Sequence, residues 1–174
     1  ESVINLSFKL GVSALLILGY GNELYGTGKP RTKDEILAYS SYAAWTAEHF
    51  KGRGYIYEIW NEWPHRTNKD SSSTNIDSAM SYLALVKYAS LAIKKVDPTA
   101  KVIAGGFNPT DGLEKEWGRY LVKYGILNYV DGLSIHPYAY SSKKLASPTT
   151  NLSIVRNFHD MLISTNKGFK EIPL

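Results

Sequence analysis

The chain has 174 residues, of which 44% are apolar, and this is enough for a globular domain with a substantial buried core. The net charge of +4 comes from scattered lysines and arginines, so the sequence gives little support for nucleic-acid binding. Because there is no cysteine, disulfides, thiolate zinc sites and cysteine nucleophiles are excluded. The longest apolar run, Ala14 to Leu18, is too short for a membrane span.

The first half of the chain predicts a helix end, a strand and a full helix. Residues 3–10 have the pattern of a final helical turn, and the continuous apolar run at 12–19 predicts a strand buried on both faces. Thr32 and Glu35 have the spacing of a capping box. Apolar residues then recur at steps of three and four, which predicts a helix that ends before Gly52.

The segment Tyr55 to Trp63 predicts the central strand, because aromatic and β-branched residues dominate it and Pro64 stops it. The later apolar patterns predict three further helices near 75–96, 113–124 and 152–165, two further strands at 101–107 and 130–138, and the opening of one more strand at 172–174. Alternation at this spacing predicts parallel strands with right-handed crossovers, an α/β fold.

Polar and aromatic side chains gather where these strands end. They are Tyr20 and Asn22, Asn61 and Glu62, Asn108, and His136 and Tyr138. Sites spread over several strand ends are typical of the (β/α)8 barrel, and the strands expected in this chain make up about half of one. Gly105 and Gly106 also follow a strand, but they lack the spacing of a phosphate-binding loop.

A carboxylate beside an amide, between two indoles at a strand end, is suited to a sugar site. Sugars pack their apolar faces on tryptophan and bond their hydroxyls to Asn61 and Glu62, and cleavage of a glycosidic bond needs a positioned carboxylic acid. The simpler interpretation is that Glu62 is a solvated loop residue. Trp45 and Trp117 are expected to pack helices on the sheet.

The histidines predict neither a metal site nor a cofactor site. His49, His65 and His159 are scattered, and none pairs with another at a helical metal spacing. We expect His49 to pack or bond locally, His65 to meet solvent rather than substrate, and His159 to lie on a solvated helix face. Glu114 and Glu116 are expected to be carboxylates in a first helical turn, favoured there by the helix dipole.

Two motifs together resemble the clan A retaining glycoside hydrolases, which are (β/α)8 barrels. They are Trp60-Asn61-Glu62 at one strand end and Ser134-Ile-His136-Pro-Tyr138 two strands later. Leu15 to Asn22 and Phe50 to Arg53 are similar to the branch of β-xylosidase-like enzymes and bacterial exopolysaccharide endoglycosidases. The resemblance implies that 1–174 is one incomplete catalytic domain, a partial barrel running approximately from the third strand through the sixth helix, without strands one, two, seven and eight.

The resemblance also implies roles for individual residues. Glu62 matches the general acid/base, and Asn61 matches the amide that bonds the 2-hydroxyl of the sugar beside the scissile bond. His136 and Tyr138 match residues that line the site and orient the nucleophile. The remaining matches are Trp60 and Trp63 as cleft walls and Tyr20 and Asn22 as substrate contacts.

In such enzymes the nucleophile is a Glu at the end of strand seven, which we expect beyond Leu174. Glu171 precedes that strand and is not expected to serve. We also expect residues before Glu1, since the sequence does not begin with Met. Glu58 has the strand parity of Glu62 and is expected deep in the barrel, paired with a base.

The predicted function is hydrolysis of β-linked glycosides of a poly- or oligosaccharide by a retaining mechanism, with a carbohydrate as the partner and no metal or cofactor. The alternatives are an inactive carbohydrate-binding protein, a half-barrel that self-associates through its exposed sheet edges, and a flavodoxin-like domain. The last does not explain why the polar residues all fall at strand ends. The resemblance alone favours a secreted or periplasmic location.

Overall fold

The computed structural model describes residues 2–26, 28–65, 73–138, 140–141, 144–145, 147–166, 171 and 173–174. One sheet holds four parallel strands in sequential order: β1 (Leu15–Leu18), β2 (Ile56–Ile59), β3 (Lys101–Phe107) and β4 (Gly132–Ile135). The helices are α1 (Ser2–Lys9), α2 (Lys33–His49), α3 (Ile76–Val96), α4 (Gly112–Lys123) and α5 (Pro148–Thr165), with a 3-10 turn, η1 (Ile126–Asn128). Two short strands, β5 (Tyr140–Ser141) and β6 (Lys144–Leu145), form an antiparallel pair.

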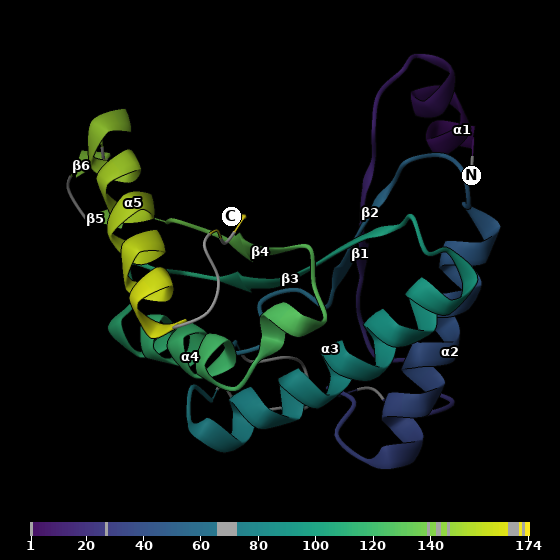
Figure 1. The fold of residues 1–174 in the computed structure, drawn as a ribbon, viewed down its shortest axis with the longest axis horizontal. Coiled ribbons are helices and arrows are strands. Elements are labelled where there is room, and N and C mark those ends of the chain that lie inside the picture. Colours follow the sequence, from purple (N-terminus) through teal and green to yellow (C-terminus); the bar gives the residue numbers. More distant parts are fainter. Residues whose placement is uncertain are drawn as a thin grey trace.

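Helices α2, α3 and α4 lie along one side of the sheet, and α5 stands against α4 beyond β4 (Figure 1). The strand register aligns one apolar row across the sheet. This row is Leu18, Ile59, Ala104 and Leu133, and each member is at most 2% exposed. Because strand side chains alternate between faces, this row forms the helix-covered side of the core.

The opposite face of the sheet is less covered. Leu15 and Ile17 of β1 remain 47% and 48% exposed. The prediction that this strand is buried on both faces is therefore wrong, because β1 is the edge strand of the sheet and only its helix-facing side chains are covered. At the other edge, the Leu133 amide donates to the carbonyl of Pro173 at 2.8 Å, so the chain returns beside β4. Residue 172, where we expected a strand to open, lies outside the described residues.

Local signals in the sequence fix where the helices begin. The capping box of Thr32 and Glu35 is present at α2, as predicted. Asn75, Asp111 and Ser147 cap α3, α4 and α5 through side-chain oxygens that accept from backbone amides. Within the described ranges, none of the helices combines the length and apolar character needed to cross a membrane.

Two helix tyrosines continue the hydrogen bonding of the sheet where its strands end. The Tyr39 hydroxyl of α2 donates to the Leu18 carbonyl and accepts from the Trp60 amide, so it joins the ends of β1 and β2. The Tyr82 hydroxyl of α3 donates to the Ile59 carbonyl at 2.7 Å and accepts from the Gly105 amide at 2.8 Å, joining β2 to β3. Burial raises the pKa of both phenols well above the ordinary value.

A row of aromatic rings crosses the core beneath these strand ends. Consecutive centroids lie 5.2 to 5.7 Å apart along Trp60, Trp63, Tyr82, Trp117, Phe107 and Phe158. Trp117 is fully buried, which confirms its predicted packing role. Trp45 is 64% exposed and stacks on His49 one helical turn later, so the prediction that it packs on the sheet is wrong. Its position on α2 faces away from the sheet.

Candidate active site

The backbone at the end of β2 turns sharply and brings Glu62 to the edge of the sheet. Trp60 and Glu62 have φ values of 62° and 49°, a left-handed conformation that costs a non-glycine residue roughly 1–3 kcal/mol. Gly106 on β3 makes this turn possible, because a Cβ built there would lie 2.9 Å from the Glu62 amide nitrogen. Residues in such conformations cluster at active sites.

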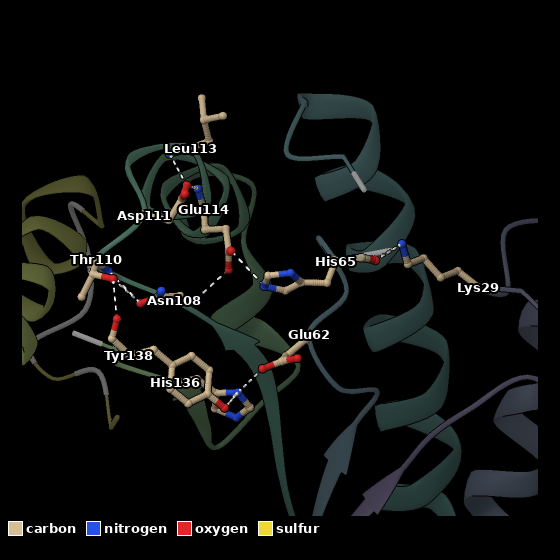
Figure 2. Close-up of polar contacts among 10 residues, drawn as sticks. All are labelled: Lys29, Glu62, His65, Asn108, Thr110, Asp111, Leu113, Glu114, His136 and Tyr138. Carbon is tan, nitrogen blue, oxygen red and sulfur yellow. Dashed lines mark hydrogen bonds and ion pairs between the residues drawn. The ribbon is translucent and has the colours of Figure 1, made fainter. Parts of the chain in front are cut away.

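Glu62 reaches across the sheet to the end of β4 (Figure 2). Its Oε1 lies 2.9 Å from Nδ1 of His136, and the Tyr138 hydroxyl lies 3.3 Å from the same nitrogen. The Glu62 and His136 side chains are 29% and 23% exposed, so both are shielded while still open to a ligand. The structure therefore brings together the three residues that the two sequence motifs predicted to share a site.

Asn61 and Tyr20 approach each other on the other side of Glu62. The Asn61 amide donates to the Tyr20 hydroxyl at 3.3 Å, and the Tyr20 ring packs edge-on against Trp60 at 5.6 Å. Tyr20 is 62% exposed, so its ring is available to a ligand. Asn22 shapes the loop, because its Oδ1 accepts from the Leu24 amide at 2.9 Å.

The two indoles beside Glu62 are core residues. Trp60 is 1% and Trp63 is 0% exposed, so the prediction that they form cleft walls is wrong. The left-handed turn at Trp60 directs its ring inward, where it packs on Tyr39 and Trp63. Lys29 covers the Trp63 ring at 5.8 Å and Arg31 at 5.9 Å. Of the predicted aromatic ligand contacts, Tyr20 and Tyr138 remain exposed.

Glu58 lies deeper on the same face of β2 and is only 2% exposed. Its burial raises the pKa of the carboxyl. A hydrogen bond from the Ser134 side chain and the nearby His136 partly offset this increase in pKa. Glu58 Oε1 has no hydrogen-bond partner among the described residues. The predicted depth is confirmed. In the described part of the chain, the hydrogen-bond partner of Glu58 is the Ser134 hydroxyl of β4, and the predicted base is represented only by the electrostatic influence of the nearby His136.

A second set of polar contacts links the loop after Glu62 to α4 (Figure 2). His65 Nε2 lies 3.0 Å from Glu114 Oε1, and Glu114 Oε2 accepts from the backbone amide of Asn108 at 2.7 Å. The His65 amide donates to the Glu62 carbonyl at 2.9 Å, and the Lys29 ammonium donates to the His65 carbonyl at 2.7 Å.

These polar contacts bear on the predictions for His65 and Glu114. His65 is half exposed, as expected for a residue that meets solvent, but it also bonds Glu114. Glu114 lies in the first turn of α4, as predicted, and is 5% exposed. The pairing spans residues far apart in sequence, and no local pattern indicates it. The sequence did point to Gly106, because the Gly105-Gly106 pair ends a strand. In the structure, Gly106 leaves room for the neighbouring backbone of Glu62 and not for a phosphate.

The arrangement is suited to proton transfer. A carboxyl that shares a hydrogen bond with an imidazole and lies beside a side-chain amide can give up and regain a proton next to a bound ligand. Among the described residues, no group of three or more histidine, aspartate or glutamate side chains is placed to hold a metal ion.

Comparisons with known proteins identify the fold. No protein-family model and no curated protein sequence matches this chain. Among solved structures, a family 39 glycoside hydrolase from the gut symbiont Bacteroides cellulosilyticus WH2 matches with a TM-score of 0.68 and 20% identity over 98% of this chain. A GH10 endoxylanase from a sugarcane soil metagenome and a thermostable mutant of a xylanase from Cellvibrio japonicus each match with a TM-score of 0.62 and 14% identity over 94% of it.

The chain spans only part of each of these proteins: 36%, 48% and 50% of their respective lengths. Sequential parallel strands, each followed by a helix on the same side, are the repeating unit of the (β/α)8 barrel. The chain therefore has the fold of part of a TIM barrel, similar to the corresponding part of these glycoside hydrolases.

Proposed function

We propose that this chain is the central part of a glycoside hydrolase that cleaves β-linked glycosides of an oligo- or polysaccharide, with Glu62 as the general acid/base. The observation that carries the proposal is the hydrogen bond between Glu62 and His136, which joins two strand ends of a barrel sheet beside the half-buried side-chain amide of Asn61. In TIM-barrel enzymes the catalytic residues come from the carboxyl ends of several strands.

The proposed reaction retains the anomeric configuration. In the first step, Glu62 protonates the glycosidic oxygen while a second carboxylate attacks the anomeric carbon, so the C–O bond breaks and a glycosyl ester forms. In the second step, the ionised Glu62 takes a proton from water, and the water oxygen displaces the ester. His136 supports both steps, because its Nδ1 hydrogen-bonds Oε1 and can stabilise either protonation state of Glu62.

The second carboxylate is proposed to lie outside the described residues. Such a group sits about 5–5.5 Å from the acid in retaining enzymes. Glu58 is 2% exposed and therefore closed to substrate, and Glu114 is occupied by His65 and the Asn108 amide. The roles predicted for Asn61 at the sugar 2-hydroxyl and for Tyr138 beside the nucleophile remain part of this proposal.

The test is hydrolysis by the native protein that contains this sequence, compared with its Glu62→Gln variant. Two of the similar structures are named as xylanases, so β-1,4-xylo-oligosaccharides and aryl β-xylosides are the first substrates. We expect kcat to fall by about 10²–10⁴-fold, because loss of general acid/base catalysis has that effect. Glu48→Gln is the matched control, since Glu48 is exposed on α2. Full activity in Glu62→Gln would contradict the assignment.

A catalytically inactive carbohydrate-binding protein is the second candidate. It is favoured by one observation: the exposed Tyr20 and the Asn61 side-chain amide lie beside Glu62, whereas the neighbouring Glu58 carboxyl is buried. In that case sugar binding would survive in Glu62→Gln and no hydrolysis would be measured in either protein.

A further inference from the structure

A pocket of about 300 Å³ lies between the loop after β1 and the first half of α2. Its side-chain lining includes Tyr20, Asn22, Tyr25, Glu35 and Tyr42. We propose that this pocket binds one or two units of a neutral sugar chain whose scissile bond lies at Glu62. The inference rests on the proposed function and extends it to a subsite outside the sheet. The volume is at the lower end for ligand pockets, which suits a unit of this size.

Tyr20 connects the pocket to the candidate active site. Its ring lines the pocket and packs on Trp60, while its hydroxyl accepts from the Asn61 amide at 3.3 Å. A ligand that leaves the pocket past Tyr20 therefore arrives at Asn61, the residue directly before Glu62. The two sites are arranged for one extended ligand.

The pocket is held in shape before any ligand binds. Its lining residue Tyr39 is fixed by hydrogen bonds to the Leu18 carbonyl and the Trp60 amide. The loop closes on itself, because the Gly26 amide donates to the Asn22 carbonyl at 2.8 Å. Gly26 has a φ of 127°, and a Cβ there would lie 2.9 Å from Glu35 Oε1. A preformed site loses less conformational entropy when it binds.

The lining chemistry favours a neutral sugar. Tyr20, Tyr25 and Tyr42 are 62%, 61% and 44% exposed, and each offers an apolar ring face and a hydroxyl, the combination that a pyranose presents in return. Glu35 is the charged member of the lining. Its Oε2 accepts from the backbone amides of Arg31 and Thr32, and these bonds lower the pKa of the carboxyl, so it repels sugar acids.

Part of the start of α2 is closed to anions. Its capping box already occupies the Thr32 and Glu35 amides with side-chain oxygens of the same two residues. Lys29 and Arg31 hold their charges over the Trp63 ring. An anionic ligand would therefore meet the Glu35 carboxylate at a helix start where two backbone amides are already bonded.

The experiment measures binding by calorimetry in the Glu62→Gln background, where hydrolysis does not consume the probe. Xylotetraose and cellotetraose are the neutral probes, and trigalacturonate is the anionic one. Tyr42→Ala removes a pocket ring, and Ala38→Phe fills the pocket from α2. Tyr88→Ala is the control, because Tyr88 is 48% exposed on α3 and lies outside the pocket lining. Circular dichroism confirms that each variant is folded.

We expect at least one neutral probe to bind, with a Kd about tenfold weaker in both pocket variants and unchanged in Tyr88→Ala. Trigalacturonate should bind much more weakly. The inference is overturned if neither neutral probe binds, if either pocket variant binds as tightly as the control, or if trigalacturonate binds equally well. Hydrolysis that depends on Glu62 without pocket-dependent binding would remove this inference alone, whereas pocket-dependent binding without hydrolysis would remove only the proposed reaction.

Discussion

The two faces of the four-stranded sheet bury very different side chains. On the helix-covered face, the row from Leu18 through Ile59 to Leu133 is wholly apolar and at most 2% exposed. On the opposite face, the register places Ile17, which is 48% exposed, beside Glu58, which is 2% exposed. On this face, the aliphatic side chain of Ile17 is thus exposed, whereas the carboxyl of the neighbouring Glu58 is buried.

The difference indicates that one face of the sheet contributes mainly to stability and that the other carries the groups suited to chemistry. The strand residues of the helix-covered face form an apolar, buried row, whereas the opposite face holds a buried carboxyl, a hydroxyl and close-approach glycines that contribute little to packing. Residues that break local rules in this way are expected at functional sites. Substitutions on the two faces should therefore differ in size and in what they change.

The largest effect is expected for Gly105→Ala. A Cβ at Gly105 would lie 2.2 Å from the Ser134 carbonyl oxygen, and its φ of 138° is itself strained for alanine. We expect about 4 kcal/mol or more to be lost from the free energy of unfolding, measured in urea. Gly112→Ala is the control, since nothing lies within 4 Å of its Cβ position, and it should change stability by less than about 1 kcal/mol. Equal losses in both variants would show that the β3–β4 contact is not tight.

The comparison of the faces can be made with one residue type. Ile59→Ala on the helix-covered face empties a fully buried site and should cost about 2–4 kcal/mol. Ile17→Ala, on the opposite face of the adjacent strand β1, removes an exposed side chain and should cost less than about 1 kcal/mol. Urea unfolding of both variants measures the difference. Similar losses would mean that the open face is covered in solution, for example by self-association.

The smallest effect concerns Glu58 and depends on pH. Burial raises its folded-state pKa above the ordinary 4.5, so the folded protein keeps this proton at pH values where the unfolded chain has lost it. The resulting stability is present below the ordinary pKa and is lost as the pH rises through the folded pKa. Glu58→Gln removes this dependence, so relative to wild type it should gain stability over the pH range above the ordinary value of 4.5. A constant difference across that range would contradict the raised pKa.

Much of the fold could be predicted because its signals are local. The alternation of apolar patterns gave the order of strands and helices, and Thr32 with Glu35 marked the start of α2. The site could be predicted in part for the same reason. Parallel strands end at one edge, so polar residues that follow nearby strands, such as Glu62 after β2 and His136 after β4, can meet there.

The remaining features depend on contacts between distant parts of the chain. From the sequence, Trp60 and Trp63 fit a ligand-binding surface and a core equally well. Their burial in the structure follows the left-handed turn at Trp60, which no sequence pattern indicates. The bond between His65 and Glu114 joins a loop to the first turn of α4, and no periodicity in the sequence relates the two. The Ser134 partner of Glu58 follows from the register of β3 and β4 and not from either residue.

The tyrosine hydroxyls of α2 and α3 have a consequence for backbone dynamics. Tyr39 and Tyr82 hold the amides of Trp60 and Gly105 in fully buried hydrogen bonds at the strand ends. Amide hydrogens at strand ends ordinarily exchange with solvent through local fraying, at low opening free energy. Here exchange requires a helix to detach from the sheet. These two amides should therefore exchange as slowly as the centre of the core, and the edge that carries Glu62 is as rigid as the sheet beneath it.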